Sequence, residues 1–196
     1  MGLLDVPAFF AHCVWVTKQD MKIMKKHGVS AVHCPTSNMK LGSGFAPIPA
    51  LLKAGINVGL GTDGCASNNN LNMFEEMHLA AVIHKGNHCD PEIVTPKEVL
   101  KMATINGAKI QGREDTGCLA VGKKADMIAL DFRNKPHLYP NFDPMALLVY
   151  SAQASDVCMT MVDGQILYQN GRFLTLDKKQ VLRDAKAAVK RLYQSK

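Results

Sequence analysis

The 196-residue sequence lacks several features that would assign a chain to a class of protein at once. Its six cysteines form no CxxC pair, which argues against a zinc ribbon or a disulfide framework, so we expect reduced and mostly buried thiols. The apolar stretch 6–16 is interrupted by His12 and is too short to cross a bilayer. No lysine or arginine stands near the start, as a secretory signal would require. We therefore expect a cytoplasmic protein with no membrane partner.

Aromatic residues are also scarce, at 6% of the chain, and their scarcity affects how the net charge of +6 is interpreted. The basic residues are densest in segment 178–196, where they alternate with apolar residues at helical spacing. This pattern predicts an amphipathic surface helix. Because basic residues interleaved with aromatic ones are typical of nucleic-acid-binding surfaces, we expect no nucleic-acid partner. A basic nucleic-acid-binding protein remains an alternative that depends on net charge alone.

The first hundred residues are organised as strand-helix units. Apolar runs bounded by turn residues predict strands, and helical periodicity with capping residues predicts helices. Consecutive units of this kind imply parallel strands joined by crossover helices. The expected strands are 9–14, which we expect to be buried, 29–33 and a short one within 57–64. The expected helices are 17–27, 47–54, 71–85 and 96–107, with a long loop through residues 38–44.

A different pattern begins at Ala125. Segments 126–131 and 157–162 are predicted strands separated by proline-containing loops. Asp163-Gly164 and Asn170-Gly171 are hairpin signals, since these pairs accept the left-handed backbone of tight turns. A small antiparallel β module therefore follows the α/β part.

Titratable residues stand at the ends of the three predicted parallel strands. His12 closes the first strand, His33 the second and Asp63 the third. Functional side chains gather at the carboxyl ends of such strands, so the three are expected to converge. A single histidine on an apolar strand is also often a hydrogen-bonded core residue. Asp63 lies between Gly61-Thr62 and Gly64, where a carboxylate must be paired, metal-bound or at a pocket mouth, because burying it alone is very costly.

Three motifs in order carry a family resemblance. They are Ala11-His12-Cys13-Val14-Trp15, then 35–41 (PTSNMKL), then 59–64 (GLGTDG). The sequence resembles the amidohydrolase superfamily, and in particular its 5-methylthioadenosine/S-adenosylhomocysteine deaminase branch, which is related to triazine chlorohydrolases and guanine deaminases. Segments 68–77, 103–108, 117–126 and 162–164 extend the resemblance over nearly the whole chain.

The resemblance implies a fold and a division into parts. The α/β units resemble about the sixth to eighth strands of a TIM-type (β/α)8 barrel, so the chain resembles the C-terminal part of such an enzyme. It implies a partial barrel at residues 1–122, a β-sandwich segment at 123–177 and a C-terminal amphipathic helix at 178–196.

The resemblance also implies roles for individual residues. Asp63 matches the metal-ligating aspartate that accepts a proton from the attacking water, and His12 matches the catalytic histidine of the sixth strand. The implied cofactor is one zinc ion, whose bound hydroxide attacks the substrate. His33 and Asn38 are candidate substrate-binding residues, although Asn38 is equally expected to secure a turn. Cys34 departs from the asparagine of many relatives.

Several expected metal ligands have no match. No His-x-His pair occurs, and neither does the fifth-strand HxxE pattern. His84 and His88 have the i, i+4 spacing of a metal pair, but they fall at the end of a helix. A catalytic zinc normally has three protein ligands, so we predict that the chain alone is inactive. The uncovered faces of a partial barrel favour self-association as a homo-oligomer or pairing with a separate N-terminal half.

The predicted activity is therefore the metal-dependent hydrolytic deamination of an adenine-type nucleoside thioether, such as S-adenosylhomocysteine or methylthioadenosine. One alternative is a hydrolase of another heteroaromatic ring of the guanine or chlorotriazine type. A second alternative is a non-catalytic fragment that folds only with a partner.

Overall fold

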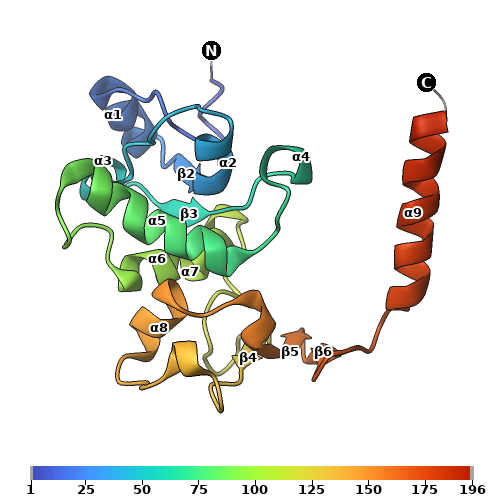
Figure 1. The fold of residues 1–196 in the computed structure, drawn as a ribbon. Helices are drawn as coiled ribbons and strands as arrows, with labels where there is room; N and C mark the ends of the chain where they lie inside the picture. The colour runs from blue at the N-terminus through green and yellow to red at the C-terminus, as the bar shows by residue number, and fades with distance from the viewer. Residues whose placement is uncertain (1, 195–196) are drawn as a thin grey trace. The chain divides into compact units, whose positions relative to one another are not determined.

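The computed structural model describes residues 2–194, which form two compact units (Figure 1). Unit 1 comprises Met1–Lys123 and Phe132–Ala154, and unit 2 comprises Lys124–Asp131 and Ser155–Lys196. Position 1 of the predicted barrel segment and positions 195–196 of the predicted C-terminal helix lie outside the described residues.

Unit 1 contains a parallel sheet of three strands in the order β1-β2-β3. The strands are β1 (Phe9–Ala11), β2 (Ser30–His33) and β3 (Val58–Leu60). Ala11 pairs with Val32, and His33 pairs with Leu60, so the three strands end at nearly the same level. The predicted parallel arrangement is confirmed, and the carboxyl ends of the strands form one edge.

Helices surround this sheet, and their starts follow from capping. Thr17 and Asp20 form a capping box at the start of α1, and Thr95 and Glu98 form another at the start of α6. Helices α6 and α7 contact β3, and α5 contacts α2, α6 and α8 (Figure 1). The helices are α1 (Lys18–Lys26), α2 (Pro35–Lys40), α3 (Ile48–Lys53), α4 (Cys65–Asn68), α5 (Met73–His88), α6 (Pro96–Ala103), α7 (Ile105–Ile110), the 3-10 turn η1 (Pro136–Leu138) and α8 (Pro144–Tyr150).

The core of unit 1 lies between the sheet and these helices. Gly59 allows the close approach of α7 to β3, because a Cβ at this position would lie 2.6 Å from Cδ1 of Ile110. Apolar side chains from the strands and helices fill the remaining space, and the most buried of them are Ala31, Ile48, Leu51, Val58, Ala80, Ala81, Val99, Met102, Leu138 and Val149.

Two predictions for the N-terminal part were wrong. The first strand was expected to be buried, but Phe9 is 54% exposed and Phe10 is 40% exposed, because β1 is an edge strand that pairs only with β2 among the described residues. The predicted loop after the second strand contains α2. This helix begins at Pro35. Proline lacks a backbone N–H, and at the first position of a helix this N–H would have no intrahelical acceptor, so no hydrogen bond is lost.

Further differences concern the later helices and the cysteines. The helix predicted over 96–107 is two helices, since the backbone turns at Thr104, whose hydroxyl donates to the carbonyl of Leu100 at 2.6 Å. Helix α8 was missed, although Asp143 caps it and a proline opens it. The cysteines are free, as expected, but most of them are not buried. Cys13 and Cys34 are buried, Cys158 is half-buried, and Cys65, Cys89 and Cys118 are exposed.

Unit 2 contains the predicted antiparallel module. Its strands β4 (Met127–Leu130), β5 (Val157–Val162), β6 (Gln165–Gln169) and β7 (Arg172–Phe173) form a sheet in chain order, and the 3-10 turn η2 (Ala154–Asp156) precedes β5. Asp163-Gly164 and Asn170-Gly171 make the two tight turns with positive φ throughout, as predicted. The rings of Tyr168 and Phe173 pair across strands at 5.2 Å.

The C-terminal segment is helical. Helix α9 (Lys178–Gln194) carries an exposed apolar stripe on a basic background, as the sequence pattern predicted. Among residues 2–194, no helix combines the length and the hydropathy that a membrane span requires.

Candidate active site

Two predicted catalytic residues lie at the carboxyl edge of the parallel sheet. His12 directly follows β1, and its backbone N–H donates to the carbonyl of Val32 in β2 at 2.9 Å. Asp63 follows β3 by three residues. Both have left-handed backbones, with φ of 67° at His12 and 60° at Asp63. Such conformations are uncommon outside glycine and gather at functional positions, where the surrounding structure maintains them.

The carboxylate of Asp63 is held by three hydrogen bonds. The hydroxyls of Ser37 and Ser67 donate to its Oδ2 at 2.7 and 2.6 Å, and the backbone N–H of Gly64 donates to its Oδ1 at 2.7 Å. The hydroxyl of Ser67 is the largest of the causes that lower the pKa of Asp63 to about 2, followed by Ser37, Gly64 and the nearby His12. Asp63 is therefore a fixed anion at neutral pH. Such a low pKa suits a metal ligand or an electrostatic partner better than a group that must take up a proton.

The imidazole of His12 connects Asp63 to a second predicted residue. Its Nδ1 lies 2.9 Å from Oδ1 of Asn38, and its Nε2 lies 3.7 Å from Oδ2 of Asp63. An amide oxygen only accepts hydrogen bonds, so Nδ1 carries a proton and Nε2 is directed toward the carboxylate. Asn38 itself is 1% exposed. The structure thus brings together His12, Asn38 and Asp63, with Asn38 orienting the histidine.

His33, the other predicted substrate-binding residue, is placed differently. Its side chain is 2% exposed, and its Nε2 lies 3.2 Å from Nε2 of His84 in α5. Burial, together with His84 and His12, lowers the pKa of His33 to about 3. Burial and the nearby His88 lower the pKa of His84 to about 4. This position favours a core role for His33, because so little of its surface is open to a substrate.

Cys34 follows His33 and lies near the same edge. Burial raises the pKa of its thiol to about 11, and the negative charges of Asp63 and Glu76 contribute. The thiol is therefore protonated at neutral pH and is a poor nucleophile.

The residues that support Asp63 were not predicted from the sequence. Ser67 is four residues after Asp63, a helical spacing that offered a signal for the contact. Glu76 in α5 gave no such signal, because a glutamate in a helix is normally expected on the solvent side. It is 1% exposed and accepts hydrogen bonds from Nδ2 of Asn68 at 2.7 Å and from the backbone N–H of Thr36 at 3.2 Å.

The donor set of this edge is smaller than that of a catalytic zinc site. Asp63 and His12 offer one carboxylate and one imidazole, whereas such a site normally has three protein ligands and an open position. Within residues 2–194 there is no cluster of three or more His, Cys, Asp or Glu side chains suited to a metal ion. His84 and His88 form no metal pair, since His84 faces His33 and His88 contacts the backbone carbonyl of His84. These residues alone do not fit a zinc ion.

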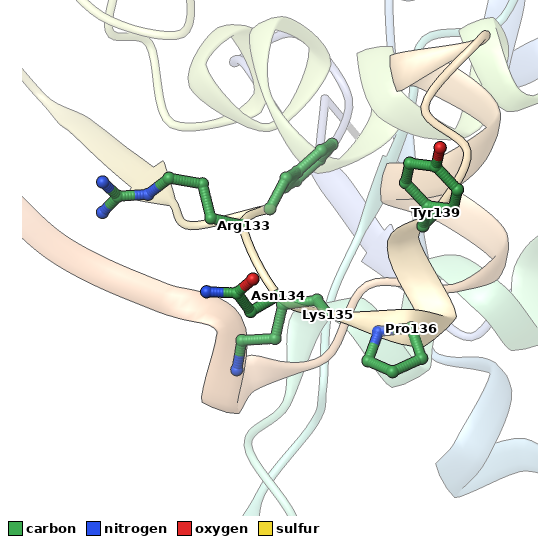
Figure 2. A pocket seen from close by; sticks show the side chains of 6 residues that line it. Arg133, Asn134, Lys135, Pro136 and Tyr139 are labelled. Carbon is green, nitrogen blue, oxygen red and sulfur yellow. The ribbon is translucent and has the colours of Figure 1, made fainter.

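A separate hollow of about 690 Å³ lies in the segment after β4 (Figure 2). Arg133 and Tyr139 lie on opposite sides of it in this view. Its lining contains no carboxylate and no histidine, the side chains that most often perform general acid-base chemistry. The lining residues are Phe132, Arg133, Asn134, Lys135, Pro136 and Tyr139.

Comparisons with known proteins identify the family. The model of the amidohydrolase family matches residues 1–167. The 5-methylthioadenosine/S-adenosylhomocysteine deaminase of Acetivibrio thermocellus is 52% identical over 192 residues, which cover 97% of this chain and 44% of that protein. The 5'-deoxyadenosine deaminase of Methanosarcina mazei is 50% identical over 192 residues, covering 98% of this chain and 44% of that protein. The chain thus spans less than half the length of the curated relatives it matches.

Solved structures agree with this assignment. An adenosine deaminase from Xanthomonas campestris with bound zinc superposes with a TM-score of 0.91 at 33% identity, covering 95% of this chain and 42% of that one. An atrazine chlorohydrolase from Arthrobacter aurescens complexed with zinc superposes with a TM-score of 0.84 at 30% identity, covering 91% of this chain and 40% of that one. By sequence and by fold, the chain belongs to the amidohydrolase family.

Proposed function

We propose that the chain is the C-terminal portion of a hydrolytic deaminase that acts on an adenine-type nucleoside thioether, such as S-adenosylhomocysteine or methylthioadenosine. In this reaction water adds to the ring carbon that bears the amino group, the carbon–nitrogen bond breaks, and ammonia leaves. The observation that carries the proposal is the convergence of His12, Asn38 and Asp63, with the carboxylate held by Ser37 and Ser67. The names of the relatives supply the substrate class.

The proposal assigns the chain to one part of the family fold. Strands β1, β2 and β3 correspond to about the sixth, seventh and eighth strands of a TIM-type barrel, within a barrel segment at residues 1–122. Residues 123–177 correspond to a β-sandwich segment and 178–196 to a terminal helix. Two observations support this division: strands β1 to β3 are parallel, and the strands of unit 2 are antiparallel.

We propose that zinc binds only in the assembled enzyme. Asp63 supplies one ligand, and the remaining ligands come from residues outside this chain, in a separate N-terminal half or a longer form of the protein. The zinc bound in the similar structures supports the choice of metal. Homo-oligomerisation is the other proposed assembly, and the exposed edge strand β1 supports either kind of pairing. The cytoplasmic location stays a prediction.

The function is tested by measuring zinc content and ammonia release. The chain alone is compared with the chain combined with the N-terminal half of the 52% identical relative. We expect stoichiometric zinc and ammonia release from S-adenosylhomocysteine or methylthioadenosine only in the combination. Asp63→Ala should abolish both, whereas Asp184→Asn, on the exposed helix α9, should leave both intact. Deamination that survives Asp63→Ala undiminished would refute the proposal.

A second candidate, hydrolysis of another heteroaromatic ring, is favoured by one observation. The atrazine chlorohydrolase superposes well on the chain, with a TM-score of 0.84. Rates measured side by side with S-adenosylhomocysteine, guanine and a chlorotriazine separate the two candidates. A higher kcat/KM for guanine or the triazine would replace the first assignment with the second.

A further inference from the structure

A buried carboxylate in α5 contacts two separate short helices near the active-site edge, α2 and α4. Glu76 lies in the first turns of the helix and is 1% exposed. Its Oε1 accepts from Nδ2 of Asn68 at 2.7 Å, and its Oε2 accepts from the backbone N–H of Thr36 at 3.2 Å. A buried carboxylate is tolerated only when it is hydrogen-bonded, so Glu76 and its two donors hold one another in place.

Each donor is the chain neighbour of a hydroxyl that binds Asp63. Thr36 precedes Ser37, whose hydroxyl lies 2.7 Å from Oδ2 of Asp63. Asn68 follows Ser67, whose hydroxyl lies 2.6 Å from the same oxygen. Helices α2 and α4 therefore both contact Asp63 on one side and α5 on the other.

The backbone next to Asp63 is tied to the same point. Nδ2 of Asn68 also donates to the carbonyl of Thr62 at 2.7 Å, directly before Asp63. This bond helps to fix the chain where Asp63 adopts a φ of 60°. One buried side chain of α5 thus connects the backbone before Asp63 with both of the short helices, α2 and α4, that carry its hydroxyl partners.

We propose that Glu76 is a positioning residue that keeps Ser37 and Ser67 at the carboxylate of Asp63. It acts through α2 and α4, so the orientation of Asp63 depends on a helix outside the edge of the sheet. The relevance of Glu76 to a reaction rests on the proposed function, which gives Asp63 its role. The arrangement itself is a property of this chain and is measurable without substrate, metal or turnover.

Glu76→Gln tests the proposal with little change in size. A glutamine side chain has one acceptor group and one donor group, whereas Glu76 faces two donors, so one of its two bonds is lost. Glu75→Gln is the matched control, because Glu75 is the exposed neighbour on the same helix. The readout is NMR of the intact 196-residue chain, using the amide proton of Gly64, which donates to Oδ1 of Asp63 at 2.7 Å, and the couplings that report the χ1 angle of Asp63.

We expect Glu76→Gln to shift the Gly64 amide proton upfield, several times further than Glu75→Gln does, and to average the Asp63 couplings. Resonances of the buried residues Val99 and Met102 should stay in place, which reports an intact core. The same substitution in a chain that lacks both serine hydroxyls, Ser37→Ala with Ser67→Ala, should have no further effect on Gly64. Such non-additivity identifies the path through the serines.

Asn68→Ala cuts the connection from the opposite side and serves if Glu76→Gln does not fold. It should reproduce the upfield shift of Gly64. The proposal is overturned if either folded variant leaves Gly64 and Asp63 unchanged, or if the effect of Glu76→Gln persists without the serine hydroxyls. A deaminase that needs Asp63 but shows no such signature contradicts only this inference, whereas a clear signature without deaminase activity contradicts only the proposed function.

Discussion

Acid should destabilise this protein through its buried histidine pair, His33 and His84. His33 and His84 have pKa values lowered to about 3 and about 4, mainly by burial. The groups that face them and add to these shifts are His12 and His88. The unfolded chain, in which a histidine titrates near an ordinary pKa of about 6.5, therefore binds more protons than the folded chain between pH 7 and pH 5.

The sign and size of the effect follow from this difference. Stability is fully present above the unfolded pKa of about 6.5 and falls as the pH decreases toward the folded values. Each ring that stays neutral down to pH 5 lowers the free energy of unfolding by about 2 kcal/mol relative to pH 7, so the pair accounts for about 4 kcal/mol. Asp63, with a pKa of about 2, does not contribute in this window.

The assay is urea unfolding of the intact chain at pH 7, 6 and 5, with NMR titration of the histidine ring protons. His84→Gln removes one titrating ring and should reduce the pH-dependent loss to about 2 kcal/mol. His78→Gln, at an exposed position of the same helix, should retain the full loss attributed to the pair. Ring resonances of His33 and His84 that titrate near 6.5, or an equal loss in wild type and His84→Gln, would refute the reasoning.

Four further outcomes are expected. Ser67→Ala should raise the pKa of Asp63 from about 2 toward its ordinary value of 3.8, measured by the carboxyl carbon shift, since it removes the largest cause of the lowering. Thr17→Ala removes the capping box of α1 and should reduce the free energy of unfolding in urea by about 1 kcal/mol. Gly117→Ala should cost roughly 1–3 kcal/mol by the same measurement, because φ is +86° and the new Cβ would lie 2.9 Å from backbone. Gly86→Ala, in open space within α5, should be neutral or stabilising.

Much of the active-site edge was predictable because parallel strands place their ends together. His12 and Asp63 are 51 positions apart in the chain, yet strand-end reasoning brought them to one place, where their side chains lie 3.7 Å apart. The tight turns of the antiparallel module were equally predictable from the sequence, because Asp-Gly and Asn-Gly pairs favour the positive φ values that these turns require.

The unpredicted features depend on contacts between distant segments. Glu76 and His84 lie on the buried face of α5, where a pattern based on hydrophobicity assigns polar residues to solvent. Only the donors Thr36 and Asn68, and the partner His33, make those positions favourable, and none of these lies in the same helix. The exposure of Phe9 likewise follows from the number of neighbouring strands, which the periodicity of one segment does not encode.

The left-handed backbones of His12 and Asp63 also restrict how this edge can evolve. At φ values of 67° and 60°, asparagine, aspartate, histidine and glycine fit with little strain, whereas β-branched residues do not. In a scan of all substitutions, cellular abundance should therefore tolerate Asp63→Asn and Asp63→Gly while penalising Asp63→Val. Deamination by the proposed assembled enzyme should be lost in all three. Neutral substitution at these positions thus tends to produce proteins that fold but have lost activity. Such proteins keep the fold on which a different ligand specificity can evolve.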